Sequence, residues 1–341
     1  MLRQIAKRWL SFSLPLMLVG ALVALPAQAA HGWLGQKAQK DDVADIGNRK
    51  IAHRSIISEQ SEISTGREYA NEIDRSARLI TDPVVTEYVN RVAQNVARNS
   101  DLKIPLTVKV IDAPEINAFA LPGGFLYVNS GLVEAADEED QLAGVIAHEI
   151  AHVAARHWAS QVTKFTILRY ATIPLIFVPM SYPVYLGVSN ALNLGLPLAF
   201  LKFSRNDESE ADFLGLQYMY KAGYDPNSYV TFFGKVSEEE RHEPGSVPRV
   251  FLDHPPTADR IIKCVEEVKT LLPQRPEYLV STSEFNDVKA RLDADINAQR
   301  AAGAGAGPKL ERRESTTQSS TAGKGGNDQA PDTPPVLRRR D

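Results

Sequence analysis

Apolar residues recur at three- and four-residue spacing along much of the chain, which predicts a mostly helical protein. The clearest helix start is Asp82-Pro83, an N-cap residue followed by proline at the first helical position. That helix should end near Asn99. Further helices are predicted over 57–80, from 137 past His152, and over 204–223, 226–240, 260–271 and 283–300. In the first of these the expected inward positions are Ile57, Ile63, Tyr69, Ile73 and Ala77.

A short β region interrupts the helical pattern. Residues 105–111 alternate and are rich in β-branched side chains, and residues 117–121 and 125–128 flank the turn signal Pro122-Gly123-Gly124. A small sheet with a tight connection follows, so we expect an α+β fold that is mostly helical. Two interpretations stay open for the hairpin: an edge strand that holds an extended substrate by main-chain pairing, or a purely structural element.

The composition limits the possible partners and metal ligands. The chain has 341 residues, of which 43% are hydrophobic and 23% charged, as in an ordinary globular protein. Its net charge of −4 gives no reason to expect nucleic acid as a partner. The single cysteine, Cys264, falls in an apolar pattern and is predicted to be a buried thiol. It excludes an intramolecular disulfide and a cysteine-rich metal site, so any zinc must be held by histidine and carboxylate.

The two ends of the chain are expected to lie outside the folded domain, which we place at residues 30–300. Residues 1–29 have a positive start, an apolar stretch and the small-x-small site Ala27-Gln28-Ala29, which together predict a cleaved signal peptide and a periplasmic protein. An uncleaved membrane anchor is the alternative. Residues 301–341 are rich in Gly, Ala, Ser, Thr and Pro and predict a disordered tail.

Residues 165–201 form an apolar segment in which Arg169 is the only charged residue. Prolines and glycines interrupt it, whereas a transmembrane helix needs about 20 uninterrupted apolar residues. Three interpretations compete: a buried helical hairpin, a segment that dips into or binds a membrane surface, and a pair of true spans. Contact with a membrane surface is therefore one expectation for this segment.

The central chemical signal is His148-Glu149-Ile150-Ala151-His152. On a helix, two histidines four residues apart point from one face and can hold one zinc ion. The glutamate between them can take a proton from a water molecule that the ion activates. The alternative without a metal is a helix that carries two histidines by chance. His157 lies half a turn round that helix from His148, so we expect it at the surface or in a second layer around the site.

A second signal is the pair Glu208 and Asp212, again four residues apart on one predicted helical face. Glu208 can reach a metal as the third protein ligand, and Asp212 can accept a hydrogen bond from the far nitrogen of a ligand histidine. The alternative is a solvated acidic helix start, and Glu210 is expected at the surface. Further on, His254 precedes two prolines and is expected either at the metal or as a donor to the substrate oxyanion.

Four segments in order resemble the gluzincin zinc metallopeptidases that include the Ste-type CAAX proteases, HtpX and BepA. They are Asn117–Ala120 with Pro122-Gly123-Gly124, His148–His152, Ser204-Arg205 with Glu208–Asp212, and His254-Pro255-Pro256 with Arg260. The resemblance implies a zincin-type domain with its small sheet beside the HExxH helix.

The resemblance also implies roles for individual residues. One zinc ion per chain would be bound by His148, His152 and Glu208, with Glu149 as the catalytic base, Asp212 in a second layer, and His254 close to the metal as a second catalytic residue. The segment with Asn117 resembles the substrate-binding edge strand, and Ala118, Phe119 and Arg260 are the further expected substrate contacts.

Among these relatives the chain looks most like a stand-alone periplasmic domain of the BepA type, because it shows neither several membrane spans nor a 34-residue repeat. The leading hypothesis is a metalloendopeptidase of the cell envelope that hydrolyses misfolded or unassembled envelope proteins. A second is a chaperone or assembly factor for outer-membrane proteins whose peptidase activity is latent, with His254 in the fourth zinc position. A third is a membrane-embedded CAAX-like protease.

Overall fold

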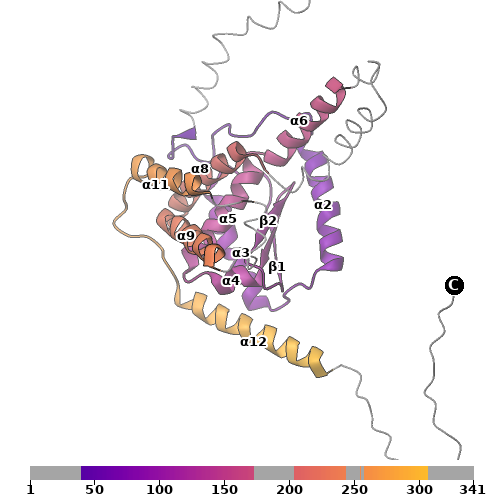
Figure 1. Ribbon diagram of the computed structural model, residues 1–341, viewed down its shortest axis with the longest axis vertical. Helices are drawn as coiled ribbons and strands as arrows, with labels where there is room; N and C mark the ends of the chain where they lie inside the picture. The colour runs from indigo at the N-terminus through magenta and orange to yellow at the C-terminus, as the bar shows by residue number, and fades with distance from the viewer. Residues whose placement is uncertain (1–39, 173–202, 243–253, 255–256, 306–341) are drawn as a thin grey trace, which may run out of the picture. The chain divides into compact units, whose positions relative to one another are not determined.

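The computed structural model describes residues 40–172, 203–242, 254 and 257–305 (Figure 1). Residues up to 299 form one compact unit; of the second unit, 300–341, only the helical residues 300–305 are described. The predicted signal peptide and residues 173–201 of the apolar segment lie outside the described residues. So does the predicted tail beyond residue 305. These three assignments stay predictions.

The described part is mostly helical with one small sheet, which confirms the predicted α+β class. Each predicted helix and strand has a counterpart, with ends shifted by a few residues. The elements in chain order are α2 (Glu59–Ser76), α3 (Pro83–Arg98), β1 (Thr107–Ile111), β2 (Ala118–Leu121), β3 (Phe125–Asn129), α4 (Ser130–Ala135), α5 (Glu139–Ala154), α6 (His157–Thr172), α8 (Arg205–Ala222), α9 (Pro226–His242), α11 (Ala258–Leu271) and α12 (Ser283–Gly305).

The sheet has the strand order β1-β3-β2, with β1 parallel and β2 antiparallel to β3. Helix α2 covers one face, where Ala70 packs with Tyr127 (Figure 1). Helices α3 and α5 pack on the other face, against Leu126 and Val128. On its far side β2 pairs with no other strand among the described residues, so its main-chain groups there face an open edge.

The predicted inward face of α2 is wrong at Tyr69, whereas Ile73 and Ala77 pack against the buried cluster of Ala70, Ile111 and Tyr127. The buried residues of α2 are Glu62, Gly66 and Ala70, whereas Tyr69 is exposed. The helix approaches the backbone of the β2–β3 turn so closely that a Cβ on Gly66 would lie 1.7 Å from the Pro122 oxygen. Small residues therefore form this contact, and the larger apolar side chains lie to either side of it.

Helix α5 lies at the centre of the core, with α3, α8, α9 and β2 packed against it. Helix α8 begins in a capping box between Ser204 and Asp207 and ends at Gly223, whose φ of 96° is left-handed. At the crossing with α5, a Cβ on Gly215 would lie 3.2 Å from the His148 nitrogen. This close crossing brings the first turns of α8 opposite the histidines of α5.

The chain turns sharply after α5. The helix ends at Ala154, Arg156 takes a left-handed φ of 58°, and α6 starts at His157. Ile167, Leu168 and Tyr170 near the end of α6 are more than half exposed, and they belong to the described part of the apolar segment. None of the helices within the described ranges combines the length and apolarity needed to cross a membrane.

Candidate metal centre

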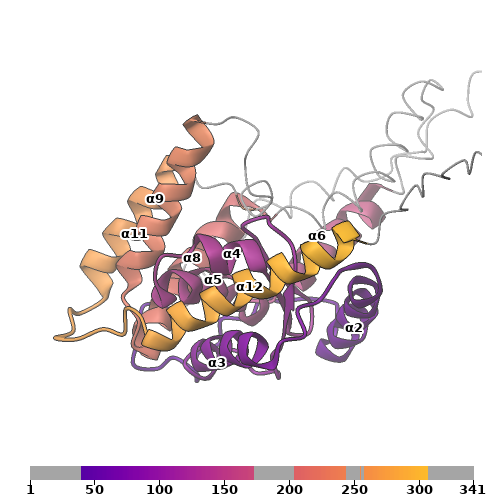
Figure 2. The same ribbon diagram turned by 90° about the horizontal axis from the view of Figure 1, so that it is seen from below.

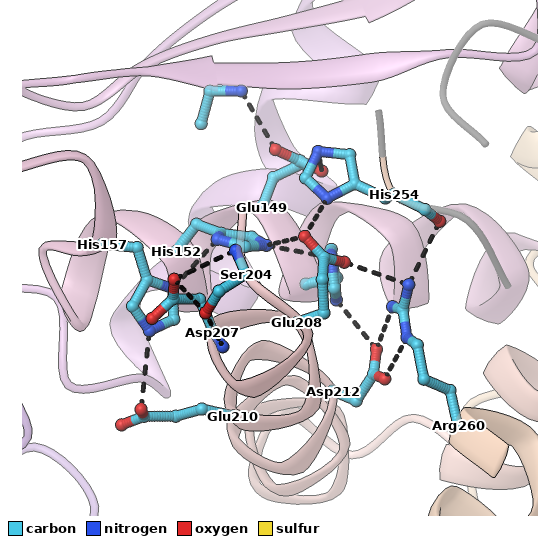
Figure 3. Close-up of polar contacts among 12 residues, drawn as sticks. Glu149, His152, His157, Ser204, Asp207, Glu208, Glu210, Asp212, His254 and Arg260 are labelled. Carbon is cyan, nitrogen blue, oxygen red and sulfur yellow. Dashed lines mark hydrogen bonds and ion pairs between the residues drawn. The ribbon is translucent and has the colours of Figure 1, made fainter. Parts of the chain in front are cut away.

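Three buried side chains from two helices converge at the C-terminal half of α5. The Nε2 atoms of His148 and His152 lie 3.1 Å apart. The Glu208 carboxylate of α8 faces both, at 3.5 Å from His148 Nε2 and 3.6 Å from His152 Nε2. The three predicted ligands are thus brought together, as Figure 3 shows for the residues it labels.

These donors fit a metal ion chemically. Two imidazole nitrogens and a carboxylate oxygen within 4.8 Å of one another are the donors that zinc accepts when no cysteine is present. Two Nε2 lone pairs facing each other in a buried site repel unless a proton or a cation lies between them. His148, His152 and Glu208 would therefore hold an ion.

The Asp212 carboxylate orients His148 from behind. It lies 3.0 Å from His148 Nδ1 and accepts hydrogen bonds from the Tyr229 hydroxyl at 2.7 Å and from two guanidinium nitrogens of Arg260, each at 2.7 Å. Burial alone would raise the pKa of Asp212, but the hydrogen bonds from Arg260 and His148 lower it to about 2. With the Nδ1 hydrogen directed at this anion, His148 keeps its Nε2 lone pair for the metal.

Arg260, which was expected to contact substrate, contacts two carboxylates of the site. Its buried guanidinium lies between Asp212 and Glu208, 3.0 Å from a Glu208 oxygen, and it donates to the His254 carbonyl oxygen at 3.1 Å. These contacts fix the positions of the Asp212 and Glu208 carboxylates. Tyr229 is a residue that sequence reasoning missed: it sits one turn into α9, and no motif marks it.

Glu149 lies between the histidines and the sheet. Its Oε2 accepts a hydrogen bond from the Ala120 amide of β2 at 3.0 Å, while its Oε1 is buried with no hydrogen-bond partner among the described residues. Burial raises the pKa of this carboxyl. Such a group is suited to taking up and returning a proton.

His254 lies at the same centre. Its Nδ1 is 2.7 Å from Glu208 Oε1, and its Nε2 is 4.0 Å from Glu149 Oε1. It belongs with His148, His152 and Glu208 to one cluster of potential ligand atoms within 4.8 Å. Both predicted positions therefore stay open, one at the metal and one beside the reacting groups.

The predicted substrate strand lies next to the centre, and its main-chain groups alternate between the sheet and the open edge. The Asn117 carbonyl accepts from Asn129 at 2.9 Å, and Phe119 pairs with Tyr127 in the β2–β3 register, so these two residues bond into the sheet. The Phe119 ring stacks on Tyr127 on the α2 side. In an antiparallel pair the alternate residues, Ala118 and Ala120, direct their amides and carbonyls outward.

A pocket runs beside this strand. Residues Ala120 to Gly123 line one part of it, and His152 and Phe203 line another. Arg156 and Glu62 contribute charged groups to the same pocket. The pocket therefore joins the open strand edge to a predicted metal ligand.

His157 was expected at the surface or in a second layer, and Glu210 at the surface. His157 is fully buried, because the turn at Arg156 carries it back over α5, and its Nδ1 lies 2.9 Å from His152 Nδ1. Burial lowers the pKa of His157, which favours a neutral ring. Glu210 is half-buried and lies 2.8 Å from His53 Nε2. Of the two positions expected for His157, the structure shows the second layer, and the surface position expected for Glu210 is wrong.

The fold and the site together define a metallopeptidase. Residues 83–268 match the model of peptidase family M48, and the chain belongs to this family. The gluzincin resemblance and the predicted class of enzyme are thereby confirmed. The match contains α5 and α8, which carry the three predicted ligands, and most of α11.

Individual relatives carry the same class in their names. The chain is 28% identical over 306 residues to a beta-barrel assembly-enhancing protease of Escherichia coli, which covers 88% of this chain and 59% of the relative. It is 32% identical over 265 residues to a putative beta-barrel assembly-enhancing protease of Vibrio cholerae, covering 75% and 53%. Mitochondrial metalloendopeptidase OMA1 of Schizosaccharomyces pombe is 38% identical over 185 residues, covering 53% and 52%. The chain thus spans little more than half the length of these relatives.

Proposed function

We propose that the chain is a zinc-dependent endopeptidase of the cell envelope that cleaves misfolded or unassembled envelope proteins. The observation that carries this proposal is the convergence of His148, His152 and Glu208 beside Glu149 and an open strand edge. The membership of family M48 supports metal-dependent peptide hydrolysis. Zinc, the compartment and the substrates are the further steps of the proposal.

Zinc is favoured because the donor set is two imidazoles and one carboxylate without sulfur. Bound there, zinc would polarise the scissile carbonyl and make an attacking water more acidic. The His148 ring is held for this purpose by Asp212, and Arg260 fixes the orientation of both carboxylates through its contacts.

Glu149 would act as the general base. The Ala120 amide holds one of its oxygens, which leaves the other free to accept the proton of the attacking water. The raised pKa, caused by burial, then allows the protonated carboxyl to return this proton to the leaving amine. An extended substrate would pair with the outward groups of Ala118 and with the Ala120 carbonyl, while the Ala120 amide stays on Glu149, and so lie across the base.

The envelope assignment rests on the predicted signal peptide and on relatives named as beta-barrel assembly-enhancing proteases. A test uses the purified chain with casein as an unfolded substrate, and measures cleavage and bound metal on the same samples before and after a chelator. Cleavage should fall in proportion to zinc content and return when zinc is restored. Cleavage that persists after the zinc has been removed would contradict the proposal.

A second candidate function is a client-binding assembly factor for outer-membrane proteins with latent peptidase activity. It is favoured by His254, whose Nδ1 lies 2.7 Å from a Glu208 oxygen and which can complete a four-donor metal site. A four-donor site leaves no open position for substrate. The variant His254→Ala separates the two: a strong gain in casein cleavage supports latency, whereas a loss makes His254 a catalytic residue.

A further inference from the structure

A chain of polar contacts links the metal ligand His152 to a second carboxylate outside the site. His157 Nδ1 lies 2.9 Å from His152 Nδ1, and its other nitrogen, Nε2, lies 3.6 Å from Glu210 Oε2 (Figure 3). Glu210 is in turn paired with His53, at 2.8 Å, and with Lys40. The chain therefore runs from the metal centre through one buried imidazole to an anion on the opposite side of α8.

The backbone holds His157 in this position. The left-handed turn at Arg156 ends α5 and directs His157 back toward His152. The Arg156 guanidinium donates to the Ile57 carbonyl at 2.8 Å and pairs with Glu62. The amide of His53 donates to the Ala155 carbonyl at 2.9 Å, so the segment that carries His53 is tied to the same turn.

The contacts determine where the protons lie once a metal is bound. A neutral imidazole that gives its Nε2 lone pair to an ion carries its hydrogen on Nδ1. His152 must then donate from Nδ1 to Nδ1 of His157, which leaves the hydrogen of His157 on Nε2. That nitrogen has no hydrogen-bond partner among the described residues but lies 3.6 Å from Glu210 Oε2, so the negative charge of Glu210 favours this tautomer.

We propose that His157 is a positioning residue for the metal centre, which orients His152 and transmits to it the negative charge of Glu210. The inference rests on the proposed metal function of His148, His152 and Glu208. It gives each ligand histidine its own carboxylate: Asp212 contacts His148 directly, whereas Glu210 acts on His152 through a second imidazole. An anion placed behind a ligand histidine raises its basicity and tightens metal binding.

The same three residues offer a competing function as a second metal site, because atoms of His53, His157 and Glu210 lie within 4.8 Å of one another. Two observations favour the positioning role. The Lys40 ammonium already pairs with Glu210, which disfavours a cation there. An ion on His157 Nε2 would also place a hydrogen on His157 Nδ1, directed at the Nδ1 hydrogen that a metal-bound His152 carries.

The test measures the zinc dissociation constant by competition with a chromophoric chelator, the metal content per chain, and the absorption spectrum of the cobalt-loaded protein. The variants are His157→Asn, which keeps an acceptor for His152 but breaks the link to Glu210, and the near-isosteric Glu210→Gln. Each should weaken zinc binding at least about 10-fold and shift the cobalt spectrum, as loss of an outer partner does. Because both act through one chain, the double variant should lose little more than either alone.

The control is His53→Gln, which removes a neighbour of Glu210 that is not between Glu210 and His152; it should bind zinc like the wild type. Unfolding of the metal-free proteins by denaturant separates out a structural role, which would lower stability and leave zinc affinity unchanged. Wild-type affinity and spectrum in folded Glu210→Gln would overturn the inference. A second bound ion that His53→Gln removes would also overturn it. A wild-type chain that binds no metal would overturn the proposed function itself.

Discussion

The two ends of α5 both carry a buried glutamate, but the two carboxylates are satisfied differently. At the N-terminal end, Glu139 accepts hydrogen bonds from the hydroxyls of Tyr88, of Tyr224 at 2.8 Å and of Thr282 at 2.7 Å. At the other end, Glu149 has one oxygen on the Ala120 amide and one with no hydrogen-bond partner among the described residues. Tyr88 lies on α3, Tyr224 follows α8 and Thr282 precedes α12. Figure 2 shows these three helices.

The difference indicates that one glutamate of α5 stabilises the fold and the other takes part in the reaction. A buried carboxylate with three hydroxyl donors has a partner for each oxygen and ties α3, the connection after α8 and the segment before α12 to α5. A buried carboxylate with an unpartnered oxygen lowers the stability of the fold. A protein retains such a group where it has a chemical function. We therefore expect Glu139 to determine stability and Glu149 to determine rate.

The largest expected effect is on catalysis. Glu149→Gln should lower kcat for casein cleavage about 10³-fold, because the amide cannot accept a proton from the attacking water. Zinc content should stay that of the wild type, and the exposed Glu87→Gln serves as control. A rate within a few-fold of the wild type would remove Glu149 from the reaction and break the comparison.

Metal binding should respond next most strongly. Glu208→Gln replaces a carboxylate that faces both histidines, and it should weaken zinc binding by more than the roughly 10–100-fold that loss of an outer partner causes. Elemental analysis of the dialysed protein measures this, and Glu149→Gln is the matched control. Full zinc stoichiometry in Glu208→Gln would move the third ligand elsewhere.

At the other end of the helix the effect should appear in stability alone. Glu139→Gln leaves hydroxyls without a charged acceptor in a buried site and should lower the free energy of unfolding by about 2 kcal/mol. Denaturant unfolding gives the value, with the neighbouring Glu138→Gln as control. A change in the zinc affinity of folded Glu139→Gln would show that the two ends are coupled.

Asp140 can be compared directly with Glu139, because it is the next residue along α5 but has a buried oxygen without a hydrogen-bond partner among the described residues. Burial raises its pKa to about 7. An acid that is protonated in the folded state and ionised in the unfolded state stabilises the fold less as pH rises from about 4 to about 7. Asp140→Asn, which is neutral at every pH, should therefore be more stable than the wild type by roughly 1 kcal/mol at about pH 8.

The pH dependence is the diagnostic part of this prediction. The advantage of Asp140→Asn should shrink toward about pH 5, where the wild-type carboxyl is itself protonated in the folded state. Thermal unfolding at the two pH values measures it. An equal difference at both would mean that packing, not charge, distinguishes the variant.

Local chemistry made most elements predictable. Asp82 caps α3 as expected, accepting from Val84 at 2.8 Å, and the four-residue spacings of His148–His152 and Glu208–Asp212 needed only helical geometry to place each pair on one face. What could not be predicted depends on contacts between distant segments. Tyr229 and Arg260 reach Asp212 from two other helices; no motif marks Tyr229, and the motif that contains Arg260 does not indicate its contact with Asp212.

The full burial of His157 has a definite physical cause. The prediction counted His157 on the periodicity of an uninterrupted helix, but α5 stops at Ala154. A residue with a left-handed φ is usually glycine or asparagine. Here it is Arg156, which is held by Glu62 and the Ile57 carbonyl. The prediction that Tyr69 of α2 faces inward was also wrong, because the close backbone approach at Gly66 places small residues at that contact.

The open edge of β2 also exposes the protein to self-association. Unpaired amides and carbonyls along a strand recruit any extended chain, including a strand of another copy of the same protein. Strand β2 is only four residues long, and Pro122, which follows it, has no amide hydrogen to donate. The edge therefore offers few ladder bonds to a chance partner, and lengthening β2 would increase aggregation along with any gain in peptide affinity.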